Sequence, residues 1–157
     1  MQIIGKMTQE DKELLLKDLC ARLPYGVKVQ IDLQSNIYPP ISCKVCNIEF
    51  TENEGAFIGV ETSPDTYNEF REFLCKPYLF PLSSMTEEQK IECFKGTPLE
   101  IDKYGDIAVK DDFYGNSQYT DLEIYLEVID WLNKKHFDYR ELIPMGLAID
   151  ATGLNIY

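Results

Sequence analysis

The sequence predicts a single α+β domain over residues 1–157, in which a small antiparallel sheet packs against helices. Three observations predict this class. The length of 157 residues is that of one domain, and a chain of this size can bury a sizeable core. Segments that alternate apolar and polar residues stand beside segments with apolar residues at helical spacing. No linker, repeat or low-complexity tract divides the chain.

The first predicted element is a helix over residues 9–22. Thr8 and Asp11 have the spacing of a capping box, and the acidic residues of the first turn suit the positive end of the helix dipole. The leucines recur at helical spacing, which predicts a buried stripe of Leu15, Leu16, Leu19 and Leu23.

Three strands are predicted next, over residues 27–31, 41–50 and 56–61. The first of them alternates apolar with polar residues, as a half-buried strand does. Residues 52–55 read Glu-Asn-Glu-Gly, a turn that joins the second and third strands in antiparallel fashion. Together these segments predict hairpin pairing near residues 27–61.

A helix is then predicted over residues 65–74. Ser63 supplies a capping residue, and Pro64 stands near the first turn, where proline is tolerated. The apolar residues of this segment lie on one side of such a helix, at Tyr67, Phe70, Phe73 and Leu74. The alternative is that only the stretch just before Lys76-Pro77 is helical.

The second half of the chain predicts two helices around a hairpin. A helix near residues 86–95 begins with Thr86 and Gln89 at capping-box spacing. A hairpin follows near residues 99–110, and then a helix near residues 121–135. This last helix is expected to bury Leu122, Tyr125, Leu126, Ile129 and Leu132. The predicted core of the whole domain comprises Leu15, Leu19, Leu23, Val27, Leu79, Leu126, Ile129, Leu132 and Phe137.

The formal net charge is −12, and it comes from two segments, residues 49–72 and residues 98–130. The first holds seven acidic residues and one basic residue, and the second holds nine and two. Such a field repels nucleic acid and anionic membranes and favours a partner with a basic surface. No apolar run reaches the ~20 residues of a membrane span, and the first residues lack the pattern of a signal peptide. We therefore expect a soluble, cytoplasmic protein that binds neither nucleic acid nor a membrane directly.

Cys43 and Cys46 form a C-x-x-C pair, which occurs in zinc sites and in thioredoxin-type redox sites. Zinc needs two further ligands at compact spacing, and the remaining cysteines and the histidine are scattered. Positions 43 and 46 of a strand face opposite sides, so the two thiols would diverge. A structural role is the favoured interpretation, and metal or redox roles are the alternatives. We expect five free cysteines, no metal and no cofactor.

His136 is the sole histidine, and Asp138 follows at a spacing that could orient its ring as in a catalytic triad. No serine lies in a G-x-S-x-G elbow, and the phosphate-binding motifs GxGxxG and GxxxxGK[ST] are absent. The position of the histidine suits a polar residue that complements the end of the helix dipole. No catalytic residue is assigned.

Three blocks of sequence are distinctive as strings: DLCARLPYGVKVQ, YLFPLSSMTEEQK and DWLNKKHFDYRELIPMGLAI. In this order they resemble a family of small uncharacterised proteins from gut Bacteroidetes and their phages and mobile elements. The blocks cover about a third of the chain and leave out both acidic segments. The resemblance implies no activity and no catalytic residue. It implies a setting among accessory genes, whose products often bind and modulate other proteins.

Aromatic residues accompany both acidic segments, and in the second they stand in a loop that contains glycine, asparagine and serine. We expect this segment to bind a partner through Asp102, Tyr104, Asp106, Asp111, Asp112, Phe113, Tyr114 and Tyr119. The carboxylates would steer the encounter with a basic surface, and the rings would supply most of the binding energy. A loop that is merely solvated is the alternative for this segment.

The leading hypothesis is a non-enzymatic acidic interaction protein that binds a basic surface of another protein. An inhibitor or modulator encoded by a phage or mobile element would fit this description. The alternative is a small-ligand-binding domain or minor hydrolase with a pocket between the sheet and the helices.

Overall fold

The computed structural model describes residues 7–53, 55–110 and 122–157. Within these residues the helices are α1 (Gln9–Arg22), α2 (Glu87–Phe94) and α3 (Leu122–Lys134). The strands are β1 (Lys28–Ile31), β2 (Ile41–Thr51), β3 (Gly55–Ser63), β4 (Thr66–Arg71), β5 (Cys75–Pro81), β6 (Leu99–Ile101), β7 (Ile107–Val109), β8 (Phe137–Asp138) and β9 (Ile149–Asp150). Short 3-10 turns are η1 (Leu23–Tyr25), η2 (Glu72–Leu74) and η3 (Leu82–Ser84).

Both described capping boxes form as predicted. The Thr8 hydroxyl accepts the backbone N–H of Asp11 at 3.1 Å, and the Asp11 carboxylate accepts the N–H of Thr8 at 3.0 Å. Thr86 and Gln89 repeat this exchange at the start of α2, at 3.2 and 2.9 Å. Two of the N–H groups that every helix leaves unpaired are thereby satisfied in each case.

In the described part of the chain, seven strands form one sheet in the order β4-β3-β2-β1-β5-β8, with β9 also paired to β5. The strands from β4 to β5 pair antiparallel, and β8 and β9 join β5 in parallel. β6 and β7 form a separate antiparallel hairpin. The predicted class, a single α+β domain with a small and mostly antiparallel sheet, is confirmed.

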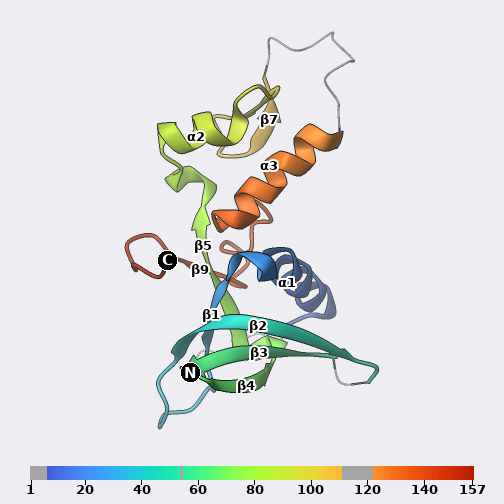
Figure 1. Cartoon of the computed structure of the whole chain (residues 1–157), viewed down its shortest axis with the longest axis vertical. Coiled ribbons are helices and arrows are strands. Elements are labelled where there is room, and N and C mark those ends of the chain that lie inside the picture. Colours follow the sequence, from blue (N-terminus) through green and yellow to red (C-terminus); the bar gives the residue numbers. More distant parts are fainter. Residues whose placement is uncertain (1–6, 54, 111–121) are drawn as a thin grey trace.

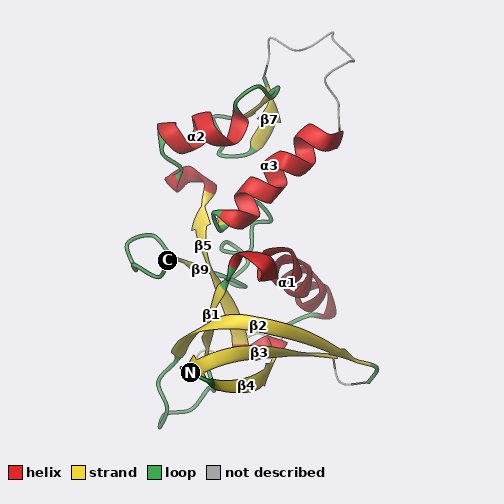
Figure 2. Ribbon diagram, viewed as in Figure 1, coloured by secondary structure: helices red, strands yellow, loops and turns green. Residues whose placement is uncertain are grey.

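Figure 1 shows β2, β3 and β4 crossing the lower end of the molecule, while β1 and β5 run along its length. Helix α1 covers the inner face of this sheet, and its leucines pack with the inward side chains of β1, β2 and β3 in one core. Two of the three described helices, α2 and α3, lie in the upper half with the β6–β7 hairpin (Figure 2). A second core joins them around Phe94, Val128, Leu132 and Phe137.

The predicted helix over residues 65–74 is wrong, because residues 66–71 form β4 and only η2 is helical. Ser63 pairs with Thr66, so Pro64 and Asp65 form a two-residue turn between β3 and β4. Asp65 has a left-handed backbone with φ 62, and proline followed by such a residue is the pattern of a type II turn. The alternative that only the stretch before Lys76-Pro77 is helical agrees with η2.

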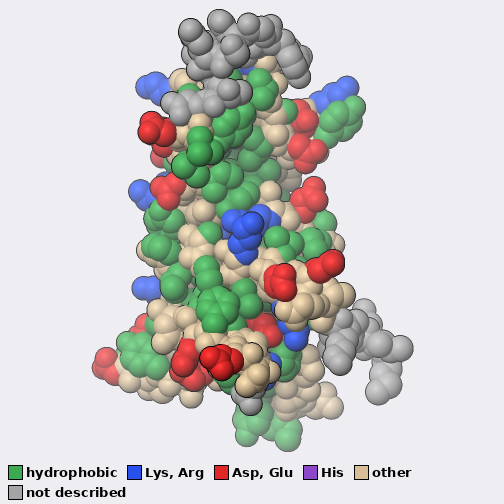
Figure 3. Space-filling view, turned by 90° about the vertical axis from the view of Figure 1, so that its right-hand side faces the viewer, with side chains coloured by type: hydrophobic (Ala, Val, Ile, Leu, Met, Phe, Trp, Pro, Cys, Tyr) green, Lys and Arg blue, Asp and Glu red, His purple; other side chains and the backbone are tan. Residues whose placement is uncertain are grey.

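Helix α3 lies where it is predicted, but it buries a different face. Leu122 and Leu126 are 69% and 56% exposed, whereas Val128 and Leu132 are buried. Ile129 is half-buried, as is Leu23 in the first core, and the other predicted core residues are buried. Figure 3 shows hydrophobic side chains over the upper half of the molecule, where α3 faces the viewer. None of the described helices is both long enough and apolar enough to span a bilayer.

Candidate functional site

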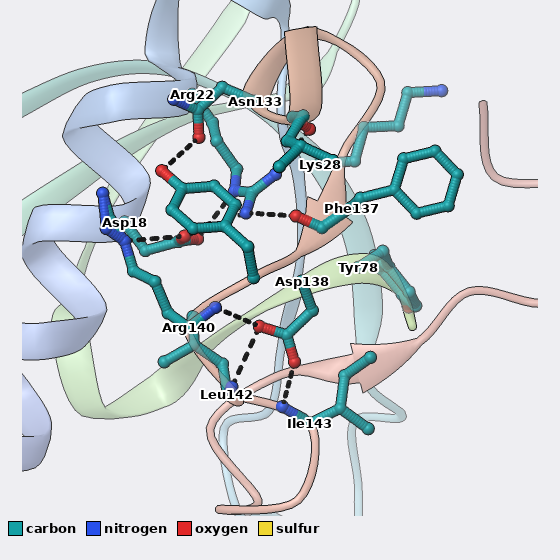
Figure 4. Close-up of polar contacts among 12 residues, drawn as sticks. Asp18, Arg22, Lys28, Tyr78, Asn133, Phe137, Asp138, Arg140, Leu142 and Ile143 are labelled. Atoms are coloured by element: carbon teal, nitrogen blue, oxygen red, sulfur yellow. Dashed lines mark hydrogen bonds and ion pairs between the residues drawn. The ribbon is translucent and has the colours of Figure 1, made fainter. Parts of the chain in front are cut away.

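A buried polar cluster joins α1 to the segment that follows α3 (Figure 4). Arg22 is fully buried and donates to the Asp18 carboxylate at 2.9 and 3.0 Å. The same guanidinium donates to the carbonyls of Leu132 at 3.4 Å and Phe137 at 2.7 Å. Arg140 adds a second cation 3.5 Å from Asp18. Every charge in the cluster therefore faces a partner within the chain, which is the arrangement of a structural clamp.

Asp138 lies in the same cluster but does not orient His136. Its carboxylate accepts the backbone N–H groups of Arg140, Leu142 and Ile143 at 3.3, 3.0 and 2.8 Å. These bonds fix the tight turn after β8 and engage both carboxylate oxygens. The triad-like pairing of His136 with Asp138 is thus not formed among the described hydrogen bonds.

His136 follows α3 in a left-handed conformation with φ 62 and is buried. Its ring stacks on the Tyr157 ring, with centroids 3.9 Å apart and planes 10° apart. Burial, together with the nearby cations of Arg22 and Lys28, lowers the pKa of His136 to about 4. The imidazole is therefore neutral at pH 7, so it does not act on the helix dipole as a cation.

The cysteine pair diverges as predicted. Cys43 is buried against α1 and Cys46 is exposed on the other face of β2. All five cysteines are free. Burial raises the pKa of the Cys75 and Cys93 thiols to about 12, so both remain protonated at neutral pH. Among the described residues no three His, Cys, Asp or Glu side chains cluster as metal ligands would.

The predicted partner-binding segment is described only in part. Asp102 has a structural role, because its carboxylate accepts the N–H groups of Tyr104 at 2.8 Å and Asp106 at 3.0 Å and so builds the turn between β6 and β7. Tyr104 is 76% exposed, with the Lys103 ammonium 4.9 Å from its ring centroid, and Asp106 is exposed. The other predicted residues, Asp111, Asp112, Phe113, Tyr114 and Tyr119, lie outside the described residues.

A different acidic and aromatic surface appears on the outer face of the β2–β3–β4 sheet, on the side away from α1. Cross-strand partners point to the same face of a sheet, and the pairing sets Asn47, Gly59 and Glu69 in one row across the three strands. The next pairs on this face are Glu61 with Tyr67 and Glu49 with Phe57. This surface, defined by Glu49, Phe57, Glu61, Tyr67 and Glu69, is called the outer face below.

A shallow depression of about 360 Å³ lies in the outer face. It is lined by Cys46, Asn47, Gly59, Tyr67, Asn68 and Glu69. Gly59 leaves room for the Asn47 side chain, since a Cβ there would stand 1.8 Å from the Asn47 amide oxygen. The depression thus offers an amide, a carboxylate and the edge or face of a 64% exposed phenol ring.

Two cations also lie on the outer face, Lys44 as the cross-strand partner of Glu61 and Arg71 as that of Phe57, but neither is ion-paired with a carboxylate of this face among the described residues. Arg71 lies 3.5 Å from the buried Glu72 and over the Phe57 and Phe73 rings, at 5.4 and 5.7 Å. None of the ion pairs among the described residues includes Glu49, Glu61 or Glu69. Acidic side chains are visible around the lower part of the molecule, where the β2–β3 hairpin projects toward the viewer (Figure 3).

The alternation of side chains in residues 66–71 could have revealed this face, but it is hidden once the segment is interpreted as a helix. In a helix, Tyr67 and Phe70 share a side; in a strand, Tyr67 and Glu69 do. No family model, curated protein or solved structure that was searched matches the chain. The chemistry of the outer face is therefore inferred from its own residues.

Proposed function

We propose that the protein is a non-enzymatic interaction protein that binds a basic surface of another protein through its outer face. The observation that carries this proposal is the depression flanked by Tyr67 and Glu69, beside carboxylates that take part in none of the described ion pairs. A lysine or arginine side chain would find three suitable groups there: the Glu69 carboxylate, the Asn47 amide oxygen and the Tyr67 ring.

The acidic and aromatic groups of the outer face have separate roles in this proposal. Carboxylates on the surface speed the encounter with a basic partner and reject acidic ones, an effect that salt screens. A phenol ring buried at an interface contributes mainly to the lifetime of the complex. A net charge of −12 extends the attraction to the whole molecule.

The exposed tip of the β6–β7 hairpin, with Tyr104 and Asp106, is the second candidate contact. It lies at the upper end of the molecule, whereas the outer face lies at the lower end (Figure 1). A compact partner would therefore contact one of the two surfaces. The outer face is preferred because it combines a depression with an exposed ring and several carboxylates on one rigid sheet.

The geometry favours surface recognition over a buried ligand pocket. The depression lies on the side of the sheet away from α1, and not between the sheet and the helices. Drug-sized ligands are usually enclosed by mostly apolar walls. Here polar and apolar surface contribute about equally to the lining, and the hollow is only half enclosed. The resemblance to proteins of phages and mobile elements adds an inhibitor or modulator of a host protein to this proposal.

The test is affinity capture from a bacterial lysate at low and high salt, followed by kinetics with the captured partner. Reversing charge with Glu61→Lys and Glu69→Lys should slow association and flatten its salt dependence. Tyr67→Ala should speed dissociation, with a loss of about 1–3 kcal/mol. The matched controls are Glu88→Lys, on an exposed turn of α2, and Phe50→Ala, whose ring is 63% exposed but lies on the opposite face.

The controls decide between the surfaces. The two control variants, Glu88→Lys and Phe50→Ala, should bind the partner like the wild type. If the outer-face variants also bind like the wild type and Tyr104→Ala loses affinity, the partner uses the β6–β7 hairpin. If neither set changes the kinetics, the proposal is contradicted.

A further inference from the structure

The sheet ends at β4, and this edge is open. β4 pairs with β3 on one side and is the last strand in the sheet order (Figure 1). Residues 66–69 are four consecutive exposed residues, so both faces of the strand and the edge between them reach solvent there. Phe70 and Arg71 are half-buried where the chain turns into η2.

Some of the backbone N–H and C=O groups along this edge have no described hydrogen-bond partner. At its two ends, the carbonyl of Thr66 accepts the Thr62 hydroxyl and that of Arg71 accepts the Cys75 thiol. Between them, residues 67–70 make no described backbone hydrogen bond outside the pairing with β3. In an antiparallel pair, alternate residues direct both N–H and C=O away from the partner strand. Two of these four residues therefore present a donor and an acceptor to solvent.

We infer that β4 binds an extended, basic segment of another protein, which adds to the sheet as a further strand. This inference rests on the proposed function and specifies how the partner is held. Strand addition of this kind takes its affinity from main-chain hydrogen bonds and its specificity from alternate side chains. On the outer face, the residues of the added strand would lie beside Tyr67 and Glu69, next to the depression.

The negative charge of the chain indicates which kind of strand can pair with β4. An exposed edge strand normally invites pairing with another copy of the same chain, and charged side chains on the edge oppose it. Here two copies would each bring a net charge of −12 and a Glu69 carboxylate to the same short ladder. A segment with lysine or arginine at alternate positions would instead place cations beside Glu69 and the Tyr67 ring. The complementary occupant is therefore a basic strand and not a second copy.

The test uses the full chain and four blocked octapeptides at low salt. The first alternates lysine with threonine or valine, and the second replaces its lysines by glutamate. The third carries N-methyl groups on the lysine residues only, and the fourth on the threonine and valine residues only. N-methylation removes a backbone donor without changing charge, and only one alternate set of residues can donate to β4.

The lysine peptide should bind more tightly than the glutamate peptide, and Glu69→Gln should weaken its binding while the control Glu88→Gln does not. One N-methylated peptide should lose at least about tenfold in affinity, and the other should lose less than about threefold. At saturating peptide, alternate backbone amides of residues 67–70 should exchange with solvent deuterium more slowly.

The outcomes separate the inference from the function. If both N-methylated peptides bind like the parent, strand addition is overturned while the preference for a basic partner stands. If the glutamate peptide binds as well as the lysine peptide, the proposed function of the outer face fails as well. If the amides of β4 become protected without peptide as protein concentration rises, a second copy is the occupant and the inference is wrong.

Discussion

Lowering the pH from about 7.5 to about 5 should destabilise the fold by about 2 kcal/mol through His136 alone. The folded chain holds the pKa of this imidazole at about 4, against 6.5 for the unperturbed group. Between these two values the unfolded chain binds the proton and the folded chain does not. Stability is therefore complete above pH 6.5 and falls as the pH drops toward 4. The full difference corresponds to about 3 kcal/mol, reached below pH 4.

The physical cause is the environment of the protonated ring. The side chain is 6% exposed, and the Tyr157 ring covers one face of the imidazole. The buried Nδ1 atom has no described hydrogen-bond partner, so no acceptor is in place for a second N–H. The cations of Arg22 and Lys28 add electrostatic repulsion. Burial comes first and the two cations second in making the charged imidazole less stable in the fold than in water.

Two measurements check this prediction. Urea denaturation of the wild type and of His136→Asn at both pH values gives the difference in pH dependence, since asparagine tolerates the left-handed backbone at φ 62. The variant should lose about 2 kcal/mol less between the two pH values, whatever its stability at pH 7.5. The single histidine also gives one imidazole NMR signal. A titration midpoint near 6.5 in the folded protein would refute the reasoning.

Three further predictions concern packing and capping, and urea denaturation measures them all. Asp18→Ala should cost about 3–5 kcal/mol, because it leaves the buried Arg22 guanidinium without its carboxylate; a loss below about 1 kcal/mol would contradict the clamp. Leu132→Ala should cost about 2–5 kcal/mol and Leu126→Ala less than about 0.5 kcal/mol, and equal losses would contradict the orientation of α3. Thr86→Ala should cost about 1 kcal/mol through the lost cap, and no change would show that α2 does not need it.

The parts of the fold that depend on a few neighbouring residues could be predicted from the sequence. A capping box needs only four residues, and both described boxes form where their spacing is found. The β2–β3 hairpin follows from alternation and a turn, which are also local. The segment after Ser63 could not be decided this way, because a proline after serine opens a helix as readily as it forms a turn. Pairing with β3 makes it a strand, and that contact is not local.

Local sequence patterns also could not predict which face of α3 is buried. Its apolar residues occupy more than one side of the helix, so a stripe through Leu126 and a stripe through Val128 are both consistent with helical spacing. In the structure the stripe through Val128 is the buried one, and Val128 and Leu132 pack in one core with Phe137. A choice between two apolar sides depends on which partner the chain brings back against the helix. That partner, β8, comes from the segment after α3 and pairs with β5.

The candidate site was missed for a related reason. Both acidic segments and their aromatic residues are visible in the sequence, but sharing a segment does not mean sharing a surface. Asp102 is acidic and stands beside an exposed ring, yet its carboxylate is used by the backbone of its own turn. Glu69 and Tyr67 come to one face only because the segment is a strand, and Gly59 opposes Glu69 only through the register of β3.

The carboxylates of the outer face affect which strands can pair with the open edge of β4. An exposed strand edge attracts any other strand, so a protein that keeps one open must discourage pairing between its own copies. Carboxylates at Glu61 and Glu69 do so for every copy of this chain, because all carry the same charge. The same carboxylates attract a strand that carries cations. One set of side chains thus opposes self-association and favours a basic partner, and the two effects should weaken together when Glu61 and Glu69 are neutralised.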